Sequence, residues 1–225
     1  MAKRSVPFAV DEWYHCFSRG IDKRIVFESP DDYVRFMQYL YLCNADEPLR
    51  RDNLCTKSNA QIFGISRSQA LVSIATYCLM PNHFHLLLRE TREGGISRFM
   101  QKIGTAYTMY FNIKNDRTGG LFTKPFRAKH IADDTYLQRV AQYIHLNPIE
   151  LFESGWKSGK IKNFLKSEKS LRNYPFCSYR DYYDGNRSET SILTNNLFEL
   201  FRETLPPART LLLESAEYHQ NLQKS

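Results

Sequence analysis

Two apolar segments joined by a tight turn constrain the fold of this chain more than any other feature. The first, Ala70–Met80 (ALVSIATYCLM), is rich in residues that favour strands, and the second, His83–Arg89 (HFHLLLR), follows it after only Pro81-Asn82. Two strand-like runs separated by a two-residue turn are typical of a β-hairpin. We therefore expect a sheet built around an antiparallel hairpin at residues 70–89.

Further strands and helices are expected on both sides of this hairpin. Aromatic and alternating segments predict strands, which are Trp13–Arg19, the shorter Arg24–Glu28, and Pro125–Ala132. Apolar spacing and capping residues predict three helices: one that starts at Pro30 after Ser29, one from Ile96 to about Asn115, and one from Asp133 or Asp134 to near Asn147. The aromatic segment Tyr174–Tyr183 is expected to be a short packed helix. Few, hairpin-joined strands interleaved with helices indicate an α+β domain of the split βαβ kind, with helices on one side of the sheet.

The length of 225 residues fits one large domain with a small appendage. We expect that domain over residues 1–185, followed by a linker and a helical tail over residues 186–225. In that tail, Leu197–Phe201 and Ala208–Leu222 are the expected helices. The polar stretch from Asn44 to Gln69 is interpreted as an insertion-like excursion.

The basic charge is concentrated in one part of the chain. Residues 94–172 hold fourteen Lys and Arg against six Asp and Glu, a net charge of +8, whereas the remainder carries −1. Such a segment is expected to face a polyanion, although a stretch like Lys157–Arg172 is also compatible with an ordinary solvated face. Lys124, Arg127 and Lys129 are the candidate phosphate contacts, because Arg127 and Lys129 alternate with Ala128 on a strand that leads into the next helix.

Membrane-spanning and secreted classes are excluded at this stage. No apolar run approaches the roughly 18–20 residues of a membrane span. The basic N-terminus has no apolar core of the kind that a signal peptide needs. The five cysteines are scattered without a Cys-x-x-Cys pair, which argues against disulfides and a cysteine zinc site and favours buried thiols in a reducing cytoplasm.

His83-Phe84-His85 is the sharpest chemical feature of the sequence. On a strand, alternate side chains share a face, so both imidazoles are expected to project together as half of a metal site. Tyr143 and Asn147 lie four residues apart on one expected helix and therefore on the same helical face. Tyr143 could be a nucleophile and Asn147 a metal ligand, but the same spacing also fits a half-buried aromatic and a turn-capping amide. His15 and His145 are interpreted as packed structural residues.

Five motifs occur in order along the chain: YHCFSRG at residues 14–20, MPNHFHLL at 80–87, GLF at 120–122 with Phe126-Arg127, YIHLNP at 143–148, and YPF at 174–176 with Ser178-Tyr179. Over about residues 12–184 the combination resembles the single-tyrosine HUH transposases, specifically the REP-associated tyrosine transposase group of bacteria. The sequence departs from that pattern at Thr123-Lys124-Pro125, where relatives commonly have a glutamine. The excursion at residues 44–69 is longer than the family core, and the tail after residue 185 has no recognised counterpart.

The resemblance implies the HUH nuclease fold, a central antiparallel sheet of ferredoxin-like type flanked by helices. It implies that His83 and His85 bind a divalent metal ion, Mg²⁺ or Mn²⁺, that Asn147 is the third ligand, and that Tyr143 is the nucleophile. The implied activity is that of a metal-dependent endonuclease and strand transferase, a transposase, acting on single-stranded DNA. It would cleave through a 5′-phosphotyrosine intermediate and rejoin strands, at hairpin (REP-like) sequences and as a monomer.

Two other classes of function compete with this interpretation. The first is a non-cleaving protein, derived from a transposase, that binds structured single-stranded DNA or regulates through it, for which the basic segment and the aromatic content suffice. The intact His83, His85 and Tyr143 argue against it. The second is a small metal hydrolase with another substrate, which is disfavoured because no carboxylate or third histidine stands at ligand spacing.

Overall fold

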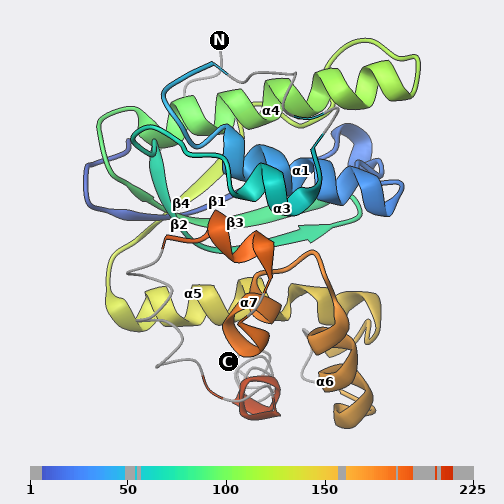
Figure 1. Ribbon diagram of the computed structural model, residues 1–225. Helices are drawn as coiled ribbons and strands as arrows, with labels where there is room; N and C mark the ends of the chain where they lie inside the picture. Colours follow the sequence, from blue (N-terminus) through green and yellow to red (C-terminus); the bar gives the residue numbers. More distant parts are fainter. Residues whose placement is uncertain are drawn as a thin grey trace.

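The computed structural model describes residues 7–48, 54, 57–156, 161–185, 187–194, 206 and 209–214. Four strands form one antiparallel sheet in the order β2-β3-β1-β4 (Figure 1). Their bounds are Trp13–Arg19 for β1, Val72–Met80 for β2, His83–Glu90 for β3 and Arg127–Ile131 for β4. With helix α1 (Pro30–Leu42) between β1 and β2, and helix α4 (Gly95–Lys114) between β3 and β4, this is the split βαβ arrangement that the sequence predicts.

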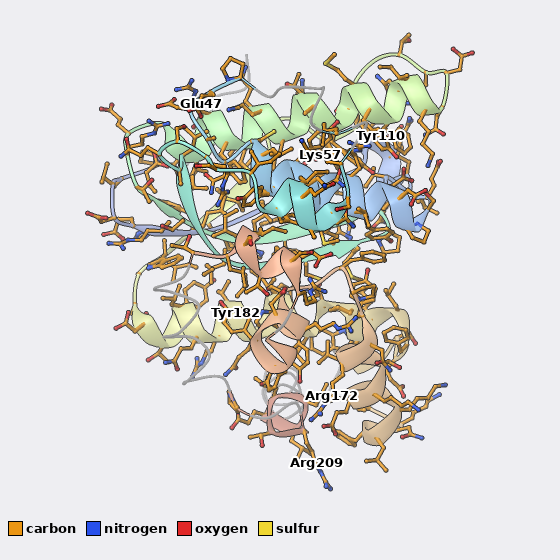
Figure 2. All side chains as sticks on the ribbon, viewed as in Figure 1. Glu47, Lys57, Tyr110, Arg172, Tyr182 and Arg209 are labelled. Carbon is orange, nitrogen blue, oxygen red and sulfur yellow. The ribbon has the colours of Figure 1, made fainter. Side chains whose placement is uncertain are left out.

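Helices cover both faces of the sheet, so the expectation of helices on one side is wrong. α1, α4 and the short α3 (Asn59–Phe63) lie on one face, and α5 (Asp134–Leu146), α6 (Phe164–Asn173) and α7 (Tyr179–Asp184) lie on the other (Figure 1). Figure 2 shows Tyr110 in the first layer and Tyr182 in the second. The prediction failed because β1 and β3 bury side chains on both faces, and an almost continuous apolar strand such as β2 requires cover on each side.

The helix starts follow from capping residues. At α1, the side chain of Ser29 and the carboxylate of Asp32 form a reciprocal capping box, with Pro30 at the first helical position. At α5, the Asp133 carboxylate accepts a hydrogen bond from the backbone N–H of Tyr136. Both features were legible in the sequence, so both helices begin where they were expected.

The predicted short strand at Arg24–Glu28 does not form. A 3₁₀ turn, Ile21–Lys23, replaces its start. The backbone N–H groups of Val26 and Phe27 both donate to the carbonyl of Pro81, at 2.8 and 3.1 Å, so the segment packs across the hairpin turn and does not pair along a strand. Its apolar residues are buried by that contact, which a local apolar pattern cannot distinguish from a strand.

The chain after α6 adds to the open edge of the sheet. Residues 174–178 run along β2, where the N–H of Leu79 donates to Phe176 and the N–H of Ser178 donates to Tyr77, both at 2.9 Å. The helix expected over Tyr174–Tyr183 is therefore wrong for residues 174–178 and is confined to α7. The expected linker beyond it is also wrong for residues 187–194, which contain the 3₁₀ helix η4 (Ser188–Ile192) and bury Ile192 and Leu193.

Residues 209–214 are helical, in agreement with the expected Ala208–Leu222 helix as far as it is described, and the helix expected at Leu197–Phe201 lies outside the described residues. The excursion at residues 44–69 contains α3 and is tied to the sheet by Asn44, whose Oδ1 accepts hydrogen bonds from Leu71 and Val72. Cys16, Cys43, Cys78 and Cys177 are buried free thiols, as predicted, and Cys55 lies outside the described residues. None of the described helices combines the length and the apolar composition needed to cross a membrane.

Candidate functional site

The face of the sheet under α5 gathers the histidines and part of the basic residues. Phe17 of β1 stands opposite His85 on β3 and opposite Arg127 on β4, while His15 stands opposite Leu87 and Lys129. Cross-strand partners point to the same face, and so do residues two apart on one strand. His83, His85, His15, Arg127 and Lys129 therefore share this face, which confirms that the two histidines of His83-Phe84-His85 project together.

Each histidine of the pair is held through its Nδ1 atom. The Nδ1 of His83 lies 2.6 Å from the Oδ1 of Asn82, and the Nδ1 of His85 lies 2.8 Å from the Nε2 of His15. The rings of His83 and His85 have centroids 5.0 Å apart. A hydrogen bond donated from Nδ1 leaves the lone pair on Nε2, which is how metal-ligating histidines are oriented in proteins. Asn82 Oδ1 only accepts, so His83 has this tautomer, whereas either ring can donate in the contact between His85 and His15.

Tyr143 reaches the same place from α5. Its ring lies edge-on to His85 and His15, with centroid distances of 5.7 and 6.0 Å. It is half-buried and lies beside the buried stripe of the helix, which consists of Leu137, Val140, Ala141 and Ile144. The helix thus packs through its apolar stripe and presents the tyrosine to the histidines.

Tyr143, His85 and His15 line one cavity of about 560 Å³. Its wall also holds two cationic side chains, Lys129 and Arg139. The remaining lining residues are Phe17, Tyr136, Val140, Gln142 and Glu214. The wall thus combines phenol, imidazole and cationic groups with one carboxylate, and its two cations suit it to a phosphate group.

Asn147 lies at the C-terminal end of α5, where the 3₁₀ helix η2 (Asn147–Leu151) begins. Its Nδ2 donates to the carbonyl of Tyr143 at 2.8 Å, and the residue is fully buried. Its Oδ1 has no hydrogen-bond partner in the described part of the chain. Asn147 is not among the residues that line the Tyr143 cavity, and its hydrogen bond is to the backbone of Tyr143.

The residues present fit a divalent metal ion in part. Among the described residues, no three His, Cys, Asp or Glu side chains come together as a ligand group. His83 and His85 nevertheless have the Nδ1 contacts that ligating imidazoles need, and the unsatisfied Oδ1 of Asn147 is an oxygen of the type that Mg²⁺ and Mn²⁺ accept. A site of two imidazoles and one amide would leave coordination positions for phosphate oxygens and water.

The three predicted phosphate contacts are divided between the two faces. Lys129 lines the Tyr143 cavity, and Arg127 projects from the same face of β4 one pair further along. Lys124 lines a different cavity, on the α4 side of the sheet.

The pKa of His15 is lowered to about 4, mainly by burial and to a smaller extent by the charge of Lys129. The imidazole next to His85 is therefore neutral at neutral pH.

The sequence interpretation did not assign five polar lining residues to the site: His15, Tyr136, Arg139, Gln142 and Glu214. His15 is packed and hydrogen-bonded, as predicted, but its partner is His85 of the candidate site. The alternation of WYHCFSR could have indicated it, since His15 shares a face with Phe17. His145, in contrast, is fully buried and contacts Ser178, in agreement with a structural role.

Comparison with known proteins adds a family and a fold. Residues 42–147, which include His83, His85, Tyr143 and Asn147, match the family described as "Transposase IS200 like". The chain is also similar to a solved structure of a REP-associated tyrosine transposase bound to a REP hairpin, with 13% sequence identity and a TM-score of 0.50, over 84% of this chain and 90% of that chain. At this identity the likeness is one of fold. The curated proteins contain no match.

Proposed function

Residues 42–147 belong to the IS200-like transposases and the chain has the fold of a REP-associated tyrosine transposase, and from this premise we propose that it cleaves and rejoins single-stranded DNA at hairpins. The observation that carries the proposal is the placement of Tyr143 against His85 within one cavity that also holds Lys129 and Arg139. The proposal includes action as a monomer, in which one chain supplies Tyr143, His85 and the two cations.

The histidines are proposed to hold Mg²⁺ or Mn²⁺ through the Nε2 atoms of His83 and His85. Asn147 is proposed as the third ligand, on the strength of its buried, unpartnered Oδ1. When bound, the metal ion polarises the scissile phosphate and stabilises the charge that develops on its oxygens. His15 and Asn82 fix the two imidazole rings for that purpose.

Tyr143 is proposed to attack the phosphorus atom in line. A bond forms between the tyrosine oxygen and phosphorus, and the bond from phosphorus to the 3′ oxygen breaks. The phenol loses its proton and the released 3′ oxygen takes one up, so the products are a 5′-phosphotyrosine link and a free 3′-hydroxyl group. Lys129 and Arg139 offset the phosphate charge in the cavity. Because the phosphodiester is retained as an ester of tyrosine, a second 3′-hydroxyl can reverse the step and join strands.

The test is covalent capture of DNA. A hairpin-bearing single strand labelled at its 3′ end is mixed with the protein and Mn²⁺, and the adduct is detected after denaturation in SDS. We expect an adduct with the wild type, and none with Tyr143→Phe, with His83→Ala or in EDTA. Tyr136→Phe is the matched control, because Tyr136 lines the same cavity and is expected to leave the adduct unchanged.

An adduct that persists undiminished in Tyr143→Phe would contradict the assignment of the nucleophile. Tight binding of the hairpin with no adduct from the wild type would instead favour the alternative, a non-cleaving protein that binds structured single-stranded DNA. The +8 charge of residues 94–172 is the observation that keeps this alternative open, since binding requires only that charge.

A further inference from the structure

Two cysteines face each other where the chain after α6 runs along the edge of the sheet. Cys78 on β2 and Cys177 in residues 174–178 form an antiparallel bridge pair. The backbone N–H groups of Leu79 and Ser178, the next residue along each segment, donate to carbonyl groups of the opposite segment at 2.9 Å. This pattern makes the cysteines a non-hydrogen-bonded pair, the closer of the two antiparallel arrangements, with Cα atoms about 4.5 Å apart.

Both cysteine side chains lie on the face of the sheet that α5 covers. Cys78 stands opposite His85 on β3, and cross-strand partners share a face. The Sγ of Cys177 donates to the backbone carbonyl of His145 on α5, at 3.9 Å. Both cysteines are fully buried, and both are thiols. The two thiols are therefore neighbours beneath the helix that carries Tyr143.

The backbone geometry of this pair suits a disulfide. Disulfides join cysteines whose Cα atoms are about 4.4–6.8 Å apart, and directly opposite residues of an antiparallel pair fall within that range. Cys16 and Cys43, the other cysteines that the structure describes, lie on the opposite side of the sheet. Cys16 alternates with Phe17 on β1 and so points to the α4 face, and Cys43 caps the C-terminal end of α1 (Figure 1).

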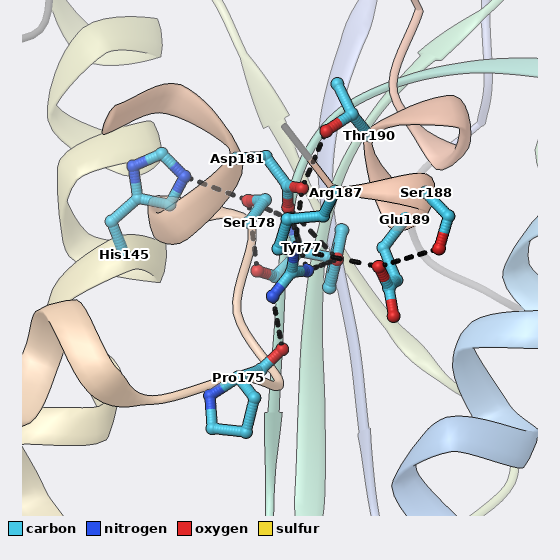
Figure 3. Close-up of polar contacts among 9 residues, drawn as sticks. All are labelled: Tyr77, His145, Pro175, Ser178, Asp181, Arg187, Ser188, Glu189 and Thr190. Atoms are coloured by element: carbon cyan, nitrogen blue, oxygen red, sulfur yellow. Dashed lines mark hydrogen bonds and ion pairs between the residues drawn. The ribbon is translucent and has the colours of Figure 1, made fainter. Parts of the chain in front are cut away.

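A bond between Cys78 and Cys177 would enclose the candidate site in a covalent loop. The two residues are 99 positions apart, and the chain between them carries β3, α4, β4 and α5. Cross-linking so long a loop lowers the conformational entropy of the unfolded chain and thereby stabilises the folded one. The bond would also fix the edge segment beside Ser178, whose Oγ contacts the backbone of Tyr77 and the ring of His145 (Figure 3).

We propose that Cys78 and Cys177 are an oxidation site, at which a small disulfide such as glutathione disulfide converts the two thiols into a cross-link between β2 and residues 174–178. One cysteine thiolate attacks the small disulfide, so a mixed disulfide forms and one small thiol leaves. The second cysteine attacks the cysteine sulfur of the mixed disulfide and releases the second small thiol. The protein loses two electrons and two protons, and the small disulfide gains both. The cross-link does not depend on the proposed function, whereas its effect on Tyr143 does.

Burial sets the condition under which the cross-link forms. A small disulfide reaches neither sulfur in the closed structure, since both cysteines are fully buried. Residues 174–178 must first separate from β2, a local opening that costs less free energy than global unfolding. Ser178→Ala removes side-chain contacts that hold this segment to Tyr77, so it is expected to speed the oxidation. Ser188→Ala, whose contact is with the neighbouring Glu189, should oxidise at the wild-type rate.

Peptide mapping tests the bond itself. The protein is incubated with glutathione disulfide, remaining thiols are blocked with iodoacetamide, and a trypsin digest is analysed by mass spectrometry. Every cysteine lies in a separate tryptic peptide, with Cys78 in Ser68–Arg89 and Cys177 in Asn173–Arg180. We expect these two peptides to be joined, and to separate on treatment with dithiothreitol. Unlinked peptides in the wild type and in Ser178→Ala alike would overturn the proposal.

Thermal unfolding tests the effect of the cross-link on stability. Oxidation is expected to raise the Tm of the wild type by about 5–15 °C and to leave the Tm of Cys177→Ser and of Cys78→Ala unchanged. The two variants remove the pair from opposite sides, so poor folding of one leaves the other as the test. Cys43→Ser keeps the pair and should show the wild-type shift. A linked wild type with an unchanged Tm would overturn the stabilising role.

Covalent capture of DNA separates this inference from the proposed function. Oxidised wild type is expected to form the Tyr143 adduct at temperatures at which the reduced protein no longer does, because the cross-link holds the segment that anchors α5. A linked and stabilised protein that forms no adduct in either redox state would refute cleavage alone. An adduct from a protein whose two cysteine peptides never link would refute the cross-link alone.

Discussion

At the scale of single residues, the site depends on hydrogen bonds that fix rings in place. His85 is oriented by His15 and His83 by Asn82. Tyr143 approaches two of these rings edge-on, a favourable geometry for aromatic pairs. His15 therefore supports the site although it was not expected there, and its contribution can be measured apart from that of the histidine pair.

His15→Ala is expected to lower the Mn²⁺ affinity about 10- to 100-fold, because groups that hydrogen-bond to ligating histidines and orient them contribute that much. The measurement is the Mn²⁺ concentration at half-maximal adduct formation, with calorimetric titration of Mn²⁺ as a second readout. His15→Gln should recover part of the affinity through its amide oxygen. The control is His130→Ala, since His130 is exposed and pairs with Glu12 at 2.7 Å. Unchanged half-saturation in His15→Ala would exclude the orienting role.

Asp32 gives the stability of the protein a defined dependence on pH. Burial by itself would raise the pKa of this carboxyl, but hydrogen bonds from Lys114, from Tyr110 and from the backbone of Glu28 and Ser29 hold it below its usual value. A lowered pKa in the folded state means that the carboxylate stabilises the fold above the pKa of the unfolded chain. That stabilisation is lost as pH falls through the folded pKa.

Asp32→Asn should therefore lower the free energy of unfolding by about 1–3 kcal/mol at neutral pH, and by less in acid. Urea denaturation at neutral and acidic pH measures the difference. Asp31→Asn, an exposed neighbour in the same first turn, is the control and should change little. A deficit for Asp32→Asn that stays constant down to acid pH would refute the linkage.

At the scale of elements, α5 is held against the sheet at its C-terminal end by the segment that follows α6. The Nε2 of His145 on α5 lies 2.9 Å from the Oγ of Ser178, which also accepts from the N–H of Tyr77 on β2 (Figure 3). Asp181 and Arg187 form a buried ion pair beside it. Burial lowers the pKa of His145 to about 3, so its ring is neutral in this contact. Ser178 thus links α5, the helix that carries Tyr143, to the edge strand β2.

Ser178→Ala is expected to reduce the free energy of unfolding by about 1–3 kcal/mol, because it leaves buried partners on Tyr77 and His145 unsatisfied. Adduct formation should slow as well, since His145 is two residues from Tyr143. Ser188→Ala is the matched control, because Ser188 bonds only to its partly buried neighbour Glu189 among the contacts described. Wild-type stability in Ser178→Ala would show that the link is dispensable.

At the scale of the whole molecule, the basic residues between positions 94 and 172 fall into two groups: those that form contacts within the fold and those that face the candidate site. On α4, Arg98 pairs with Asp46, Lys114 pairs with Asp32, and Lys102 donates to the carbonyls of Ala45 and Glu47. These cations serve the fold. On β4, Arg127 and Lys129 project from the face of the sheet on which the Tyr143 cavity lies. A phosphate chain is proposed to lie on this face.

Arg127→Ala and Lys129→Ala should each weaken hairpin binding and reduce the magnitude of the slope of log K against log salt by about 1, because each removes one phosphate contact. Anisotropy titrations across a salt series supply both quantities. Lys166→Ala removes an exposed charge from α6 and is expected to leave the slope unchanged. A salt-independent affinity of the wild type would contradict the phosphate contacts altogether.

Local patterns determined the elements that carry the chemistry. Alternation along His83–Glu90 placed His83 and His85 on one face, and the capping residues Ser29 and Asp133 located two helix starts. These features depend on backbone periodicity and on hydrogen bonds within a few residues, which the sequence states directly.

Only the tertiary structure decided which distant residues meet. The pairing of β1 with β3 brought His15 to His85, the packing of α5 brought Tyr143 to both, and the chain at residues 174–178 took the edge of β2 where a helix was expected. Asn147 stayed within hydrogen-bonding distance of Tyr143 but turned into the protein interior. Each of these depends on sheet register and on competition for buried surface between segments far apart in the chain, and no local periodicity encodes either one.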